Sequence, residues 1–81
     1  MVTAFVAVKV GTGEHLSWVK MIRENIEKVS GVKEVYSVLG RFDLIVKVQA
    51  KSVEELANIV VDGIRSIDGV IATETFLIAA P

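Results

Sequence analysis

The residues best suited to binding chemistry lie in two short segments. Four consecutive positions place backbone N–H groups, a guanidinium group, an aromatic ring and a carboxylate side by side: Gly40, Arg41, Phe42 and Asp43. Thr73 and Thr75 add two hydroxyl groups on one side of an expected strand. An amino acid needs acceptors for its ammonium group and donors for its carboxylate, and these segments supply both. A second interpretation stays open, in which Asp43 accepts a turn N–H and the threonines only favour strand structure.

The sequence offers little for catalysis or metal binding. It contains no cysteine, and His15 is its single histidine, so we assign His15 to a surface or helix-capping position. The sequence GTG at positions 11–13 lacks the further glycine and the lysine of phosphate-binding loops, so we interpret it as a turn. Arg23 and Lys28 alternate with glutamates and are interpreted as part of an ordinary solvated face. No cofactor is predicted.

The composition predicts one small domain that covers residues 1–81. The net charge of -1 provides no basic surface for a phosphate backbone, so direct nucleic-acid binding is not expected. No apolar run reaches the roughly 20 residues of a membrane span, and the first residues do not resemble a secretion signal. We therefore expect a cytoplasmic protein. A hydrophobic content of 52% is nevertheless high for a soluble domain of this size.

An internal repeat predicts the fold. The sequence VAVKV at 6–10 matches LIVKV at 44–48, and the same offset carries Gly31 onto Gly69. Each copy reads as strand, helix, strand, with strands at about 3–10, 32–39, 42–50 and 70–79 and helices at about 14–29 and 53–67. Ser52 with Glu55 forms a capping-box pattern before the second helix. Two such units predict a ferredoxin-like βαββαβ fold of the α+β class, a four-stranded antiparallel sheet with both helices on one face.

Two helices cover only one face of that sheet, and the residues of both faces are largely apolar. In the first strand one row carries Ala4, Val6, Val8 and Val10 and the other carries Phe5 and Ala7, and in the last strand Phe76 and Ile78 oppose Ile71, Leu77 and Ala79. Whichever rows the helices cover, an apolar row is left over, whereas the open face of a monomer should be polar. We therefore predict a homodimer joined sheet to sheet, a dimeric α+β barrel. Trp18 is expected in the core, whereas Ile59 points away from its helical stripe and is a candidate for a contact between dimers.

The segments VKEVYSVLGRFDLIVKVQAKSVEELANIV and IRSIDGVIATETFLI resemble the effector-binding (RAM) domain of the Lrp/AsnC, or feast/famine, regulators. The resemblance implies dimers that assemble into rings, as octamers or decamers, with small effectors, usually amino acids, bound where dimers meet. It assigns Gly40, Phe42 and Asp43 to the effector pocket, with Arg41 variable and Thr73 and Thr75 on the closing strand. Regulators of this family carry a helix-turn-helix domain ahead of the RAM domain, whereas here Met1 stands directly before the first expected strand, so we expect a stand-alone form that joins a full-length regulator.

The leading interpretation is a module for amino acid binding and oligomerisation, and not an enzyme. One alternative is a small cofactor-independent enzyme of the dimeric barrel type, in which His15 or Asp43 would be the titratable group. The other is an architectural partner of a full-length regulator that binds no ligand.

Overall fold

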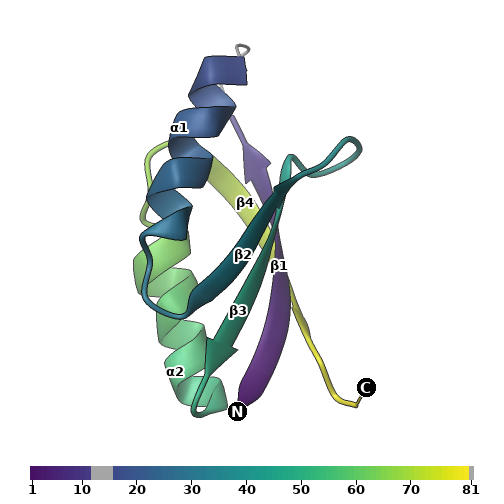
Figure 1. Cartoon of the computed structure of the whole chain (residues 1–81), viewed down its shortest axis with the longest axis vertical. Coiled ribbons are helices and arrows are strands. Elements are labelled where there is room, and N and C mark those ends of the chain that lie inside the picture. The colour runs from purple at the N-terminus through teal and green to yellow at the C-terminus, as the bar shows by residue number, and fades with distance from the viewer. Residues whose placement is uncertain (12–15, 81) are drawn as a thin grey trace.

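The computed structural model describes residues 1–11 and 16–80, so the expectations for His15 and for most of the GTG turn lie outside the described residues. The elements follow in this order: β1 (Val2–Val10), α1 (Leu16–Glu27), β2 (Val32–Ser37), β3 (Leu44–Ala50), α2 (Val53–Asn58), η1 (Ile59–Ile64) and β4 (Val70–Leu77). The helices form one layer and the sheet forms the other (Figure 1).

The four strands form one antiparallel sheet in the order β2-β3-β1-β4. Strand β1 is therefore central, and its Val8 lies opposite Leu44 of β3 on one side and Thr73 of β4 on the other. This is the ferredoxin-like arrangement predicted from the repeat. No helix in the described part of the chain is long and apolar enough to cross a bilayer.

The core lies between the sheet and the helices. Alternate residues of the two central strands point toward the helices and are fully buried, as period-two side-chain geometry requires. The core cluster consists of Ala4, Val6, Val8, Ile22, Ile26, Leu44, Val46, Val48, Ala50, Leu56, Val60 and Ile64. Trp18 packs against this cluster and donates its Nε1–H to the carbonyl oxygen of Gly11 at 3.1 Å, which confirms its predicted core position.

The second helix begins as predicted but does not continue as a regular α-helix. Ser52 Oγ accepts a hydrogen bond from the Glu55 N–H at 3.1 Å and caps α2. From Ile59 onward the backbone is a π-helix, in which the Arg65 N–H donates to the Val60 carbonyl five residues earlier at 2.8 Å. The prediction of one regular helix over 53–67 is therefore wrong in its second half.

Ile59 does not project away from the fold. It packs against the core cluster, and its Cδ1 would lie only 2.5 Å from a Cβ atom built on Gly31. Gly31 has a positive φ of 95° and no side chain, so the segment before β2 approaches the helix closely enough to cover Ile59. The expectation that Ile59 points away from its helical stripe is therefore wrong, and this removes the reason for expecting a contact between dimers there.

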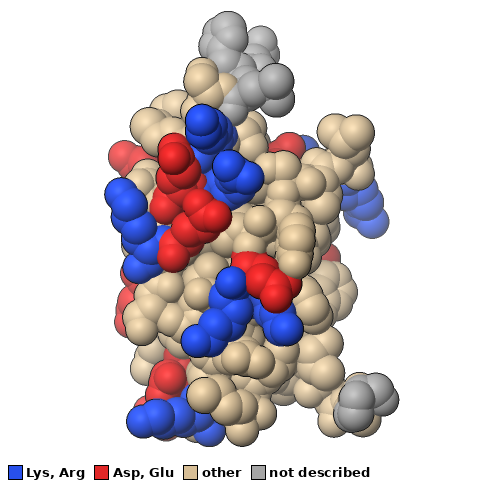
Figure 2. Space-filling model, viewed as in Figure 1, with Lys and Arg blue, Asp and Glu red and all other residues tan. Residues whose placement is uncertain are grey.

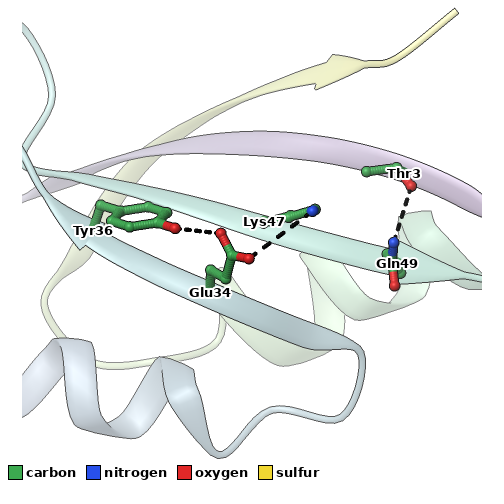
Figure 3. Close-up of polar contacts among 5 residues, drawn as sticks. All are labelled: Thr3, Glu34, Tyr36, Lys47 and Gln49. Atoms are coloured by element: carbon green, nitrogen blue, oxygen red, sulfur yellow. Dashed lines mark hydrogen bonds and ion pairs between the residues drawn. The ribbon is translucent and has the colours of Figure 1, made fainter. Parts of the chain in front are cut away.

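The sheet face opposite the helices carries apolar side chains in one part and polar side chains in another. Phe5 and Phe76 are paired across β1 and β4, and Phe76 is 50% exposed. Polar contacts on the same face, shown in Figure 3, join β2 to β3 and β3 to β1. There Glu34 accepts a hydrogen bond from the Tyr36 hydroxyl and lies 4.0 Å from Lys47 Nζ, while Gln49 Nε2 lies 3.4 Å from Thr3 Oγ1. Apolar side chains therefore predominate only in the β1–β4 half of this face, and even there Thr3 of β1 and Glu74 of β4 are polar.

Candidate functional site

The turn between β2 and β3 extends beyond the rest of the sheet as the teal loop in Figure 1. Gly40 has a φ of 144°, a backbone conformation that side-chain-bearing residues rarely adopt, and nothing lies within 4 Å of the Cβ position there. Leu39 and Arg41 are exposed, whereas Phe42 and Asp43 are half-buried. The turn therefore presents backbone and side-chain groups to solvent while its final residues remain anchored in the fold.

Asp43 forms that anchor through three hydrogen bonds. Its N–H donates to the Val8 carbonyl at 2.9 Å, and its carbonyl accepts from the Val38 N–H at 3.0 Å. Its carboxylate Oδ2 accepts from the Val10 N–H at 2.8 Å. The side chain thus continues the β1–β3 hydrogen-bond ladder past the last paired backbone residue. The Asp43 side chain does accept a backbone N–H, but from the neighbouring strand and not from its own turn.

A hollow of about 370 Å³ lies between α1 and the end of β2. We call it the turn hollow, and it is lined by Val19, Lys20, Arg23, Ser37, Val38, Leu39 and Asp43. Figure 2 shows basic and acidic side chains interspersed over the helix layer, as the charge pattern predicted. Arg23 departs from that pattern because it is half-buried, and its Nε is fully buried without a hydrogen-bond partner. Sequence reasoning missed this residue because its spacing among glutamates is typical of a solvated helix face.

Thr73 and Thr75 lie on β4 opposite Val8 and Val6, so their side chains are on the helix-facing side of the edge strand. Glu74 lies opposite Ala7 on the other face, which confirms that the two hydroxyls share one side. The threonines line a second hollow of about 410 Å³, which we call the strand groove. Its lining is mostly apolar: Val53, Leu56, Ala57, Val60, Val61, Arg65, Thr73, Thr75 and Leu77.

The two predicted segments do not meet within one chain. Leu44 and Thr73 flank Val8 from opposite sides, so the turn and the threonines are two strand spacings apart, about 10 Å. The turn hollow lies against α1 and the strand groove lies against α2 and η1, with no residue in common. A single ligand that contacts both segments would therefore require two copies of the chain.

The described residues offer no metal site. No group of three or more potential metal-ligating side chains (His, Cys, Asp or Glu) occurs among them.

The pKa of the Tyr36 phenol is raised above its ordinary value because its hydroxyl hydrogen-bonds to Glu34, with smaller contributions from desolvation and from the negative charge of Glu34. Tyr36 lies on the polar half of the open sheet face and not beside either hollow.

These features define a small ferredoxin-like α+β domain with a ligand-sized hollow at each edge of its helix layer. Residues 3–80 match the family model described as the Lrp/AsnC ligand-binding domain. The chain belongs to this family.

The proteins similar to this chain are either about twice its length or nearly the same length. An uncharacterized HTH-type transcriptional regulator of Pyrococcus abyssi is 37% identical over 75 residues, which make up 93% of this chain and 49% of that protein. The chain thus spans about half the length of the curated regulators that it matches. By contrast, the solved protein TTHA0845 of Thermus thermophilus is 41% identical, with a TM-score of 0.87 over 100% of this chain and 96% of that one.

More distant proteins share the fold or a segment of the sequence. The E. coli AsnC structure has a TM-score of 0.86 at 21% identity over 99% of this chain and 52% of that one. A Neisseria meningitidis transcriptional regulator, solved as an L-Met complex, has a TM-score of 0.82 at 15% identity over 98% of this chain and 50% of that one. A homocitrate synthase of Sulfurisphaera tokodaii is 39% identical over 57 residues, 70% of this chain but only 12% of that enzyme.

Proposed function

We propose that this chain is an effector-binding and assembly module of the Lrp/AsnC type, which binds an amino acid or a similar small molecule. The observation that carries the proposal is the turn hollow, because a ligand-sized space lies directly beside the turn that the family resemblance assigns to the effector. Asp43 at its edge provides a fixed carboxylate, the group that recognises an ammonium ion.

The second part of the proposal is self-association through the open sheet face. Phe5 and Phe76 form the centre of its apolar half, with Ile78 42% exposed beside them. Large exposed apolar patches mark interaction surfaces, and a two-fold axis would place this patch against itself. Further contacts between dimers would bring the turn hollow of one copy toward the strand groove of another. The proposal includes rings of four or five dimers, that is, octamers or decamers.

The similar proteins support a ligand-binding module that is joined to different functional domains. The curated relatives that match most of the chain are described as HTH-type transcriptional regulators, whereas the partial match lies within a homocitrate synthase. The L-Met complex of the Neisseria regulator supports an amino acid as the ligand class. We place the module in the cytoplasm, where it could co-assemble with a full-length regulator that supplies the contacts to DNA.

The alternative of a small enzyme finds less support. Asp43 is the titratable residue that such an enzyme would use beside the turn, but no second carboxylate or imidazole lines the turn hollow among the described residues to share acid–base work with it. The other candidate, His15, lies outside the described residues. The geometry therefore favours binding over catalysis.

Isothermal titration calorimetry of the full chain with each of the twenty amino acids tests the proposal. We expect saturable binding of at least one amino acid, and native mass spectrometry should show dimers or multiples of dimers. Binding of none of the twenty would remove the amino acid effector and leave the architectural alternative. A monomer at all accessible concentrations would remove the assembly.

A further inference from the structure

The outer edge of β4 presents backbone hydrogen-bonding groups at every second residue. The Ile78 N–H donates to the carbonyl of Thr3, the opposite residue on β1, at 2.9 Å. From this bonded pair, opposite residues of an antiparallel ladder alternate between bonded and non-bonded pairs. The residues that direct their N–H and carbonyl groups away from β1 are therefore Thr73, Thr75 and Leu77. No backbone hydrogen bond from another described element reaches them.

The two edges of the sheet differ in how well they are protected. At the β2 edge the register shifts between Val32 and Glu34, and Lys33 and Glu34 are charged. A bulge and charged side chains both discourage pairing with another chain. At the other edge β4 is eight residues long, contains no proline, and carries its one charge, Glu74, on the open face. A long edge of this kind is a template for an added strand.

The strand groove runs along this edge on the helix-facing side. Three of its lining residues, Val53, Val61 and Leu77, are large apolar side chains that are about half exposed. A further hollow of about 420 Å³ lies beside the start of β4 and shares Arg65 and Thr73 with the strand groove. The two hollows together follow the length of the strand. A groove between a helix and an edge strand is the geometry in which strand addition places an extended peptide.

Arg65 gives this groove a charge preference. It is the one charged residue among the described residues that line the groove, and it forms no ion pair within the described part of the chain. Because Arg65 and Thr73 line both hollows, an acidic side chain opposite Thr73 on an added strand would meet the guanidinium.

We propose that β4 and the strand groove bind an extended segment of a partner protein, which adds a strand to the edge of the sheet. The segment runs antiparallel to β4, the more stable pairing, with apolar side chains in the groove and an acidic side chain beside Arg65. The turn hollow takes no part in this contact, and the groove opens on the helix-facing side. The site therefore goes beyond the proposed effector binding and sheet-to-sheet dimer.

The test titrates the synthetic peptide acetyl-Val-Thr-Val-Thr-Glu-amide into the ¹⁵N-labelled full chain. In antiparallel pairing its two valines and its glutamate lie opposite Leu77, Thr75 and Thr73 and point into the groove. We expect a dissociation constant of about 1 mM or tighter, with shifts of the backbone amide signals of these three residues. A titration without those shifts overturns the proposal.

Modified peptides separate strand addition from unspecific apolar contact. N-methylation of the central valine removes an N–H that faces β4 and should abolish binding. N-methylation of the second threonine removes an N–H that faces away, and it should change affinity by less than about twofold. Equal effects of the two methyl groups contradict strand addition.

The charge preference is tested with glutamine in place of the peptide's glutamate. This peptide should bind about two- to fivefold more weakly, as expected for an exposed ion pair, and Arg65→Gln should remove the difference. Equal affinity of wild type for the two peptides overturns the assignment of an acidic partner.

Variants of the groove complete the test. Val61→Asp places a charge among apolar side chains and should weaken binding at least about tenfold, whereas Met21→Asp, a similarly exposed change on α1, should not. Circular dichroism checks that both variants fold. Equal weakening by the two changes contradicts docking in the groove.

Hydrogen exchange of the free chain tests whether a second copy occupies the edge instead. Fast exchange of the Thr75 amide supports a free edge, and a protected amide in the assembled chain would overturn the proposal. Amino acid titrations are independent of these measurements, so a failure of peptide binding leaves the proposed effector function intact.

Discussion

The Val10 N–H donates to Asp43 Oδ2 at 2.8 Å, across 33 residues of sequence. This bond lies where the backbone ladder between β1 and β3 stops, and it lets a side chain replace the next backbone acceptor. It explains why a carboxylate can stand at the entrance of an apolar strand: Asp43 holds the exposed turn against the central strand of the sheet. The same residue therefore links the stability of the fold to the geometry of the turn hollow.

Asp43→Ala should lower the free energy of unfolding by about 1–3 kcal/mol, because the half-buried Val10 N–H loses its acceptor. Urea denaturation followed by circular dichroism measures this change. Asp68→Ala is the matched control, since Asp68 is exposed and should have an effect within about 0.5 kcal/mol. An equal loss in both variants would contradict the anchoring role of Asp43.

Asp43→Asn separates the structural role of Asp43 from its proposed role in binding. The amide oxygen can still accept from Val10, so we expect less than about 1 kcal/mol of destabilisation. The negative charge is lost, so affinity for an amino acid should fall by about tenfold if Asp43 contacts the ammonium group. Calorimetry on the folded variant measures the affinity, and unchanged affinity would remove Asp43 from the ligand site.

Gly69→Ala should be more destabilising than Gly40→Ala. Both glycines have positive φ, 99° and 144°, so alanine costs about 1–2 kcal/mol of backbone strain at either position. Only at Gly69 does the added Cβ meet the core, at 2.5 Å from Ile22 Cδ1 and 3.1 Å from Trp18 Cζ2. Overpacking adds about 1–3 kcal/mol there. Chemical denaturation of the two variants should show this difference, and equal losses would mean that the core accommodates the methyl group.

The ionisation of Tyr36 should be shifted to higher pH by Glu34. Tyr36 is the only tyrosine, so ultraviolet absorbance of the tyrosinate reports this group alone. Because the folded state raises the pKa of Tyr36 above 10.0, the resulting stability is present below pH 10.0 and is lost as the pH rises through the folded-state pKa. Glu34→Gln should return the midpoint toward 10.0, while Glu54→Gln, an exposed change on α2, should not.

A charge on the open sheet face should prevent self-association. Phe76→Asp replaces a half-exposed ring paired with Phe5, and it should raise the dimer dissociation constant at least about tenfold through lost apolar burial. Met21→Asp places the same charge on α1, where Met21 is 45% exposed, and should leave association unchanged. Sedimentation velocity distinguishes the two variants. Dissociation by Met21→Asp instead would place the interface on the helix layer.

The sequence by itself determined the order of strands and helices and the side of the sheet that the helices cover. These features depend on local periodicity and on the 38-residue repeat, in which apolar residues at every second position of 4–8 and 44–48 must point to one face. The N-cap at Ser52 and the glycine stops at Gly31 and Gly69 are equally local, because each depends on the backbone of a few consecutive residues.

The tertiary structure alone decided what depends on residues far apart in the chain. The π-helix, the contact of Ile59 with Gly31 and the polar half of the open sheet face arise from packing between elements, which periodicity does not encode. The two predicted site segments were also assigned correctly to the turn and to β4, yet they face different hollows because β1 and β3 intervene. Arg23 has the sequence context of a surface residue, and it lacks a partner only because α1 packs against the end of β2 and buries its Nε.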